Sequence, residues 1–174
     1  MKRLLAATAA SSLTMLLTAA ASQEERADDT ARTVLGNSDS VATCYRYARR
    51  GVATEEAVRV CTRAIQTAAH RLNRTASTVN RGVVLFNAAE YELAIADFTT
   101  AIEDYGTRNP KVFVNRGLAF EQARPGDPTY EARARADYEA ALAIAPGSPT
   151  AKRRLKSLER PFIERRPLSI RTIT

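Results

Sequence analysis

Residues 80–110 carry the clearest pattern of apolar and polar positions in the chain. Apolar residues recur at helical spacing on both sides of a turn at 87–90, so the stretch predicts two amphipathic helices folded back on each other. The small residues that would let the helices touch are Gly82, Ala94 and Ala101. The larger side chains that would fill the space around this contact are Leu85, Phe98 and Ile102. Because such a pair leaves one apolar flank uncovered, neighbouring copies are expected.

Copies of this pattern occur on both sides. The triplet Asn-Arg-Gly at residues 80–82 recurs at 115–117, after 35 residues. The run Ala-Ile-Ala-Asp-Phe at 94–98 returns as Ala-Arg-Ala-Asp-Tyr at 134–138, after 40 residues. An upstream copy of the second helix lies 37 residues earlier and contains Ala57, Cys61, Ala64 and Ile65. Periods of this length are typical of stacked helical hairpins.

The pattern resembles the tetratricopeptide repeat family over roughly residues 38–160. The resemblance rests on small residues at the hairpin crossing, an aromatic residue in the second helix and a proline that closes the unit. In the first copy Tyr45 stands where the first-helix glycine is expected. The resemblance implies an all-α fold, a right-handed α-solenoid of three helical hairpins followed by a capping helix. The high alanine content and the absence of tryptophan agree with closely packed helices.

Several boundaries follow from capping residues and breakers. The first helix is expected from Ser38 to about Arg50, and the second from Thr54 to near His70. The third helix is expected to begin at Asn73 or Thr75.

The third hairpin departs from the other two. Asn-Pro at 109–110 and Asp-Pro at 127–128 predict helix starts with proline in the first turn. Five residues are inserted within 124–130, and they either form a tolerated surface loop or lengthen the second helix of this hairpin. A final helix is expected at about 150–160, with Leu155 and Leu158 covering the last hairpin and the cations Lys152, Arg153, Arg154 and Lys156 facing water.

The chain is expected to consist of four segments. Residues 1–21 read as an export signal, with Lys2 and Arg3 before an apolar run and Ala-Ala-Ala at 19–21 as the cleavage site. A membrane anchor is the alternative, but the apolar run is shorter than the roughly 20 residues that span a bilayer. Residues 22–37 read as a flexible lead-in, 38–160 as the repeat domain and 161–174 as a tail. We therefore expect a periplasmic or secreted protein.

Positive charge concentrates at the C-terminal end. The whole chain has a formal charge of +7, and residues 152–174 carry eight Lys or Arg against two Glu. This cluster could contact phosphates, but no aromatic residues are interleaved with it, so nucleic acid is not an expected partner. An anionic envelope surface and a solvated capping helix are the other two interpretations.

The repeat alignment places the two cysteines, Cys44 and Cys61, on the first and second helices of the first hairpin. Both lie on the helix faces that are expected to pack against each other. An oxidising compartment would favour a disulfide between them. Two buried thiols packed as small apolar residues are the alternative. No CxxC motif occurs and His70 is the only histidine, so neither a metal site nor a cofactor is expected.

Candidate binding residues follow from the resemblance, which places the first helix of each hairpin on a concave side that holds a peptide or protein. The lining positions are Arg46, Arg49, Val79, Asn80, Val83, Phe86, Asn87, Lys111, Val114, Asn115, Leu118 and Gln122. Asn80 and Asn115 could hydrogen-bond to the backbone of a ligand, or they could bond within the stack. Arg46, Arg49 and Lys111 would attract an acidic segment or a free C-terminal carboxylate. Val83, Phe86 and Leu118 would form an apolar patch unless neighbours cover them.

No catalytic constellation is visible. The chain lacks paired carboxylates beside a base, a serine or cysteine beside a histidine, and a glycine-rich phosphate loop. The sequence thus predicts a non-enzymatic adaptor or scaffold of the cell envelope. The alternative is an envelope-surface or hydrolase role of a cysteine-bridged helical-repeat protein.

Overall fold

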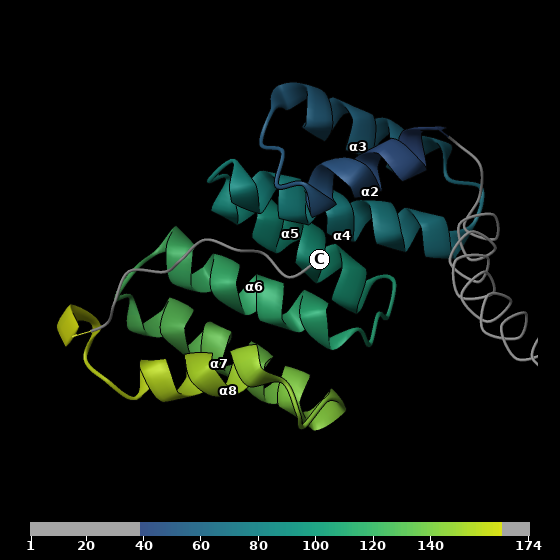
Figure 1. The fold of residues 1–174 in the computed structure, drawn as a ribbon. Helices are drawn as coiled ribbons and strands as arrows, with labels where there is room; N and C mark the ends of the chain where they lie inside the picture. The colour runs from purple at the N-terminus through teal and green to yellow at the C-terminus, as the bar shows by residue number, and fades with distance from the viewer. Residues whose placement is uncertain (1–38, 165–174) are drawn as a thin grey trace, which may run out of the picture. The chain divides into compact units, whose positions relative to one another are not determined.

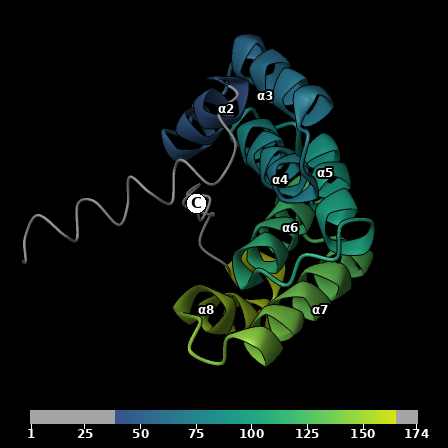
Figure 2. The same ribbon diagram turned by 90° about the vertical axis from the view of Figure 1, so that its right-hand side faces the viewer.

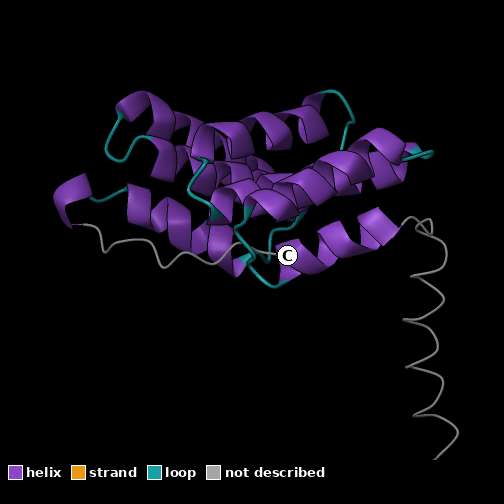
Figure 3. Cartoon of the chain, turned by 90° about the horizontal axis from the view of Figure 1, so that it is seen from above, coloured by secondary structure: helices purple, strands orange, loops and turns teal. Residues whose placement is uncertain are grey.

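The computed structural model describes residues 39–164, in which helices joined by short loops are the only regular secondary structure (Figure 3). Its elements are α2 (Asp39–Arg49), α3 (Glu55–Thr67), α4 (Arg71–Asn87), α5 (Tyr91–Glu103), α6 (Pro110–Ala123), α7 (Pro128–Ile144), α8 (Pro149–Leu158) and the 3-10 helix η1 (Phe162–Glu164). The expected signal segment, the lead-in at 22–37 and the tail beyond 164 lie outside the described residues.

Helices that follow each other in the described chain pack side by side. Each of the helices α2 to α7 contacts the next one, and α2 also contacts α4, so the array is repeat-like (Figure 1). Figure 2 shows α2, α4, α6 and α8 along one side of this array and α3, α5 and α7 along the other. We call the first set the inner helices and the second set the outer helices.

Polar caps set the starts of four helices. The side chains of Thr54, Asn109, Asp127 and Ser148 accept hydrogen bonds from backbone N–H groups in the first turn of the helices that follow them. Proline occupies the first helical turn of α6, α7 and α8, where its missing N–H costs little. Three of these starts, at Thr54, Asn109 and Asp127, were predicted from single capping residues, and the fourth was predicted within the Pro-Gly-Ser-Pro run at 146–149.

The boundary between α3 and α4 differs from the expectation. Helix α3 ends at Thr67 rather than near His70, and α4 begins at Arg71 rather than at Asn73 or Thr75. Asn73 lies inside the first turn of α4 and is buried. Its side chain therefore belongs to the packed interior, although its residue type resembles a cap.

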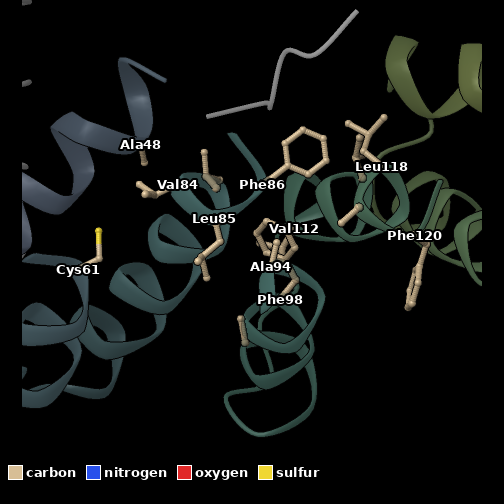
Figure 4. Close-up of a cluster of buried hydrophobic side chains, with 14 of the residues drawn as sticks. Ala48, Cys61, Val84, Leu85, Phe86, Ala94, Phe98, Val112, Leu118 and Phe120 are labelled. Atoms are coloured by element: carbon tan, nitrogen blue, oxygen red, sulfur yellow. The ribbon is translucent and has the colours of Figure 1, made fainter. Parts of the chain in front are cut away.

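Glycine permits the close approach of the two helices in each of the last two hairpins. A Cβ atom on Gly82 would lie 2.7 Å from a ring carbon of Phe98, and one on Gly117 would lie 2.7 Å from a ring carbon of Tyr138. Gly117 also faces the backbone oxygen of Ala134. Figure 4 shows Phe98 beside Ala94 in the interior of the second hairpin. The repeated Gly-to-aromatic contact is the physical basis of the sequence repeat.

The five-residue insertion lengthens an outer helix. Helix α7 has 17 residues whereas α5 has 13, and Asp127 caps its start. The extra turn carries Tyr130, whose ring lies edge-on to Phe120 with centroids 5.8 Å apart.

The first hairpin is closed by a disulfide between Cys44 and Cys61, whose Cα atoms are 4.8 Å apart. Both cysteines are fully buried. The bond joins α2 to α3 and confirms the pairing expected from the repeat alignment.

None of the helices within residues 39–164 has the combination of length and apolar character that crossing a membrane requires.

Candidate functional site

The inner helix of the second hairpin is tied to two outer helices through Arg81. Its guanidinium donates to both carboxylate oxygens of Asp97 on α5, at 2.8 and 2.7 Å. Its remaining nitrogen donates to the Thr62 hydroxyl on α3 at 3.1 Å. A two-bonded Arg–carboxylate pair fixes orientation as well as charge. Arg81 thus joins its own hairpin to the preceding one.

Arg116 repeats this arrangement one hairpin later. It donates to the two oxygens of Asp137 on α7 at 2.9 and 2.8 Å and to the Thr99 hydroxyl on α5 at 3.1 Å. Glu103 accepts a further hydrogen bond from it at 3.4 Å. We call the two sets together the Arg–Asp ladder. The two arginines and the two aspartates belong to the repeated sequence runs, but their pairing was not predicted, although polar residues that recur within a buried pattern were the available signal.

Burial and ion pairing shift the pKa values of the ladder residues in opposite directions. Burial raises the pKa of Asp137, against the lowering effect of Arg116. Burial alone would lower the pKa of Arg116, but the hydrogen bonds and charge of Asp137 outweigh it and the pKa is raised. The pKa of Arg81 is raised chiefly by its hydrogen bonds to Asp97. Both arginines therefore stay charged. Their charges are neutralised by Asp97 and Asp137 within the ladder.

A buried polar network links α6, α7 and α8. The Tyr138 hydroxyl donates to Glu121 at 2.6 Å, and Arg154 donates to both carboxylate oxygens of Glu121. Burial, followed by the negative charge of Glu121, raises the pKa of Tyr138 well above its ordinary value. The expectation that Arg154 faces water is wrong, because this buried carboxylate requires a cationic partner. Lys152, Arg153 and Lys156 are exposed, as expected.

Charge segregates between the two sides of the helical array. The inner helices carry eleven Lys or Arg against two Asp or Glu. The outer helices carry eight Asp or Glu against four Lys or Arg. Three of the inner cations form the ion pairs of the Arg–Asp ladder and of the buried network, and they are Arg81, Arg116 and Arg154. The other eight inner cations are exposed, and they are Arg46, Arg49, Arg71, Arg74, Lys111, Lys152, Arg153 and Lys156.

All of the expected lining residues belong to inner helices, but their accessibility differs. Arg46, Arg49 and Lys111 are exposed, and Val79, Asn80, Asn87 and Gln122 are partly buried. Val83, Phe86, Val114, Asn115 and Leu118 are buried, with Asn115 only 1% exposed. The buried amide favours a role within the stack at Asn115, whereas both roles considered for Asn80 stay open.

The apolar patch considered at Val83, Phe86 and Leu118 is not an exposed surface. The three side chains are 1%, 2% and 7% exposed and belong to the hydrophobic core cluster. Neighbouring residues cover these three side chains, so they do not form the apolar patch that was considered from the sequence. The accessible part of the inner side is therefore mainly polar and cationic.

A shallow pocket of about 280 Å³ lies between α2 and α3. It is lined by Asp39, Ser40, Thr43, Glu56, Arg59, Val60 and Arg63. Its charged residues partly satisfy one another, since Arg59 donates to Glu56 at 3.1 Å. Within residues 39–164 no group of three His, Cys, Asp or Glu is placed to hold a metal ion.

Neither a protein-family model, nor a curated protein, nor a solved structure matches the chain. The class of protein is therefore defined by the fold itself, an all-helical, repeat-like array with one buried disulfide.

Proposed function

We propose that the chain is a non-enzymatic adaptor that binds a protein or peptide with an acidic segment along its inner helices. The observation that carries this proposal is the segregation of charge, with eight exposed cations on the inner helices. A surface of one sign steers an oppositely charged partner and orients it during association. Outer helices of opposite net charge restrict that attraction to one side.

The finer architecture that we propose is a right-handed solenoid of three tetratricopeptide-like hairpins closed by α8. The contacts of Gly82 with Phe98 and of Gly117 with Tyr138 support it, because equivalent residues meet in consecutive hairpins. The Arg–Asp ladder supports it in the same way. In this architecture the inner helices form the concave side.

The contacts that we assign fall into two kinds. Arg46 and Arg49 on α2 and Lys111 on α6 attract the carboxylates of the partner. Asn80 and Gln122 are accessible enough to hydrogen-bond to its backbone.

We also propose that the protein works outside the cytoplasm, in the periplasm or after secretion. The Cys44–Cys61 disulfide supports this location, because such bonds persist in oxidising compartments.

The test compares two charge reversals on opposite sides of one hairpin. Arg49→Glu on α2 and Arg63→Glu on α3 change an exposed cation equally. The probe is a fluorescent ten-residue peptide rich in Glu and Asp with a free C-terminus. We expect Arg49→Glu to weaken binding about five- to tenfold, which is about 1–1.4 kcal/mol, and Arg63→Glu to leave it unchanged within about twofold. Equal losses in both variants, or no binding to the unaltered protein, would reject the proposal.

The same variants extend the test to a natural partner. A protein captured from cell-envelope extract by the unaltered chain should be lost with Arg49→Glu and retained with Arg63→Glu. Asn80→Ala tests the amide contribution, whereas Asn115→Ala also disturbs the interior because Asn115 is buried. Retention of the partner by Asn80→Ala would exclude Asn80 from the binding residues.

A further inference from the structure

Two exposed arginines stack on aromatic rings where α6 connects to α7. Arg133 on α7 lies over the rings of both Phe120 and Tyr130, with its guanidinium carbon 5.7 Å from each ring centroid. Arg124, between the two helices, lies over the Tyr130 ring at 5.7 Å. Figure 4 shows Phe120 and Leu118 pointing to opposite sides of α6, so these residues lie apart from the lining positions of the inner side. We call Phe120, Arg124, Tyr130 and Arg133 the arginine–aromatic cluster.

The sequence repeat does not require this cluster. The first helix of the hairpin repeats after 35 residues and the second after 40. At the positions that correspond to the two rings and to Arg133, the second hairpin has Leu85, Glu90 and Leu93. Arg124 belongs to the five-residue insertion and has no counterpart there. Because α4 and α5 pack together without a cation at this place, closure of a hairpin does not account for the two arginines.

Stacking occupies the faces of the two guanidinium groups and leaves their N–H edges available. Arg124 and Arg133 are exposed, and within residues 39–164 neither forms an ion pair with a carboxylate. Arg116 shows the contrast, because it also lies over the Phe120 ring, at 6.0 Å, but donates its N–H groups to Asp137. A guanidinium that is already held by stacking loses less conformational freedom when its edge binds a carboxylate.

The connection holds Arg124 at a fixed place relative to Tyr130. Gly126 has a φ of +80°, which favours glycine, and the N–H of Asp127 donates to the carbonyl oxygen of Arg124 at 3.1 Å. The Asp127 side chain accepts from the N–H groups of Thr129 and Tyr130 at 2.8 and 3.2 Å. The insertion is therefore an ordered turn that presents its arginine beside the aromatic ring.

The two guanidinium groups are close enough to bind one segment. Their central carbons each lie 5.7 Å from the centroid of the Tyr130 ring, so they are separated by no more than twice that distance. In an extended segment, side chains two positions apart point to the same side, and their Cα atoms are about 7 Å apart. Two glutamates at such positions can each reach one guanidinium, because their flexible side chains adjust the separation of the carboxylates.

We propose that the arginine–aromatic cluster is a binding site for two acidic side chains of one extended protein segment. Arg124 and Arg133 each donate paired N–H groups to one carboxylate, and Tyr130 positions both guanidinium groups. The choice of carboxylates rests on the proposed function, which assigns an acidic partner to this protein. The site is separate from the inner helices, so a partner that reaches both surfaces is held at two places.

The first experiment titrates the full chain with an acetylated and amidated heptapeptide of glycine and serine that contains two glutamates two positions apart. Blocked ends remove the free C-terminus that the adaptor test supplies. We expect the backbone amide signals of Gly126 and Tyr130 and the Nε–H signals of Arg124 and Arg133 to shift together, with a Kd on the order of 1 mM at low salt. The amide signals of Glu90 and Leu93, the counterparts in the second hairpin, should not shift.

The second experiment repeats the titration with variants. Arg124→Gln and Arg133→Gln should each weaken binding about fivefold or more, because each removes one of the two carboxylate contacts. Arg108→Gln, at an exposed arginine in the loop before α6, is the matched control and should bind within about twofold of the unaltered protein. Tyr130→Leu should weaken binding, whereas Tyr130→Phe should retain it because the ring is kept.

A lack of shifts at the cluster overturns the inference, as does an equal loss of binding with Arg108→Gln. Variants that lower the unfolding temperature but leave the titration unchanged would give the cluster a structural role only, and they also overturn it. Inorganic phosphate that saturates the same signals with a lower Kd than the peptide would assign the site to phosphate groups instead of carboxylates.

The inference and the proposed function can fail separately. Binding to the inner helices is measured by the response to Arg49→Glu, whereas binding to the cluster is measured at the signals of Arg124 and Arg133. We expect Arg49→Glu to leave the shifts at the cluster unchanged within about twofold, because Arg49 lies on α2. Loss of those shifts with Arg49→Glu would show that the cluster is not a separate site.

Discussion

At the scale of single residues, the room between packed helices limits which side chain fits at a position. Gly82 and Gly117 are required because an aromatic ring of the partner helix occupies the place of a Cβ atom. Tyr138 occupies the position of Phe98 one hairpin later, and its hydroxyl is satisfied by Glu121. The same repeat position therefore carries a purely apolar contact in one hairpin and a buried polar network in the next.

Gly82→Ala should destabilise the fold by about 1–3 kcal/mol, because the new methyl group forces Phe98 or the α4 backbone to move. Gly147→Ala is the matched control. A Cβ there meets nothing within 4 Å, so a change within about 0.5 kcal/mol is expected. Urea unfolding followed by circular dichroism measures both, and equal stability of the two variants would refute the close contact.

Stability should fall when the pH rises above about 10, the ordinary pKa of tyrosine. The pKa of Tyr138 is raised in the folded state by burial and by Glu121, so the folded protein retains a proton that the unfolded chain releases. The contribution of Tyr138 is complete below pH 10 and is lost as the pH rises through the folded-state pKa. Tyr138→Phe should flatten this alkaline decline, whereas Tyr45→Phe at an exposed position should preserve it. The free energy of unfolding of the three proteins, measured between pH 8 and 11, tests this prediction. An equal alkaline decline in all three would contradict it.

At the scale of elements, the helices are held by links that cross from one hairpin to the next. Arg81 on α4 contacts residues of both α3 and α5, and Arg116 on α6 contacts residues of both α5 and α7. A two-bonded Arg–carboxylate pair has a fixed geometry, so these bonds add orientation to the apolar packing between the helices. The Cys44–Cys61 bond has the corresponding role in the first hairpin, which has no preceding hairpin among the described residues.

Arg81→Met should cost about 1–3 kcal/mol, because it leaves the carboxylate of Asp97 buried without its cation. Adding Asp97→Leu should recover part of that loss, which gives a coupling energy of about 0.5–3 kcal/mol in a double-mutant cycle. The pair Arg59 and Glu56 is exposed on α3 and serves as the comparison, with an expected coupling below about 0.5 kcal/mol. Equal coupling in the two pairs would show that burial contributes nothing.

Reduction of the Cys44–Cys61 disulfide should lower the free energy of unfolding by about 3 kcal/mol, the loop-closure contribution of a bond between residues 17 apart. Thermal unfolding with and without reductant measures this loss. The Cys44→Ser plus Cys61→Ser variant is the control, and reductant should not change its transition. If the unfolding temperature of the unaltered protein were the same with and without reductant, the bond would not constrain the unfolded chain.

At the scale of the molecule, α8 closes one end of the described array. Its buried Ala151 and Leu158 face the interior, Arg154 neutralises Glu121, and Lys152, Arg153 and Lys156 are exposed. A terminal helix with one apolar side and one charged side is what a repeat array needs in order to stay soluble. The same helix also adds three exposed cations to those of the inner helices.

A chain that ends after Pro146 should lose at least about 2 kcal/mol of stability, because the apolar surface of α7 and the carboxylate of Glu121 both lose their cover. Lys156→Glu, an exposed change on α8, should be nearly neutral. Thermal unfolding combined with size-exclusion chromatography distinguishes the two, and a truncated chain as stable and monodisperse as the full one would contradict a capping role.

Much of the fold could be predicted from local pattern. The spacing of glycine, alanine and aromatic residues predicted the helices, and cap-plus-proline pairs at 109–110 and 127–128 predicted two helix starts. Asn73 misled the prediction, because a buried asparagine inside a helix resembles a cap when burial is unknown. The candidate site was harder to predict, since the accessibility of Phe86 and Leu118 depends on what covers them and not on their helical register.

The sequence by itself determined the all-helical class, the repeat period and the cysteine pairing, because each depends on residue spacing within one or two neighbouring helices. The tertiary structure decided the partners of the charged residues and the burial of the inner side chains. Arg154 and Glu121 are 33 residues apart, and only the packing of α8 beside α6 and α7 makes them a pair. Contacts of this kind depend on how whole helices lie against each other, and no local period records that arrangement.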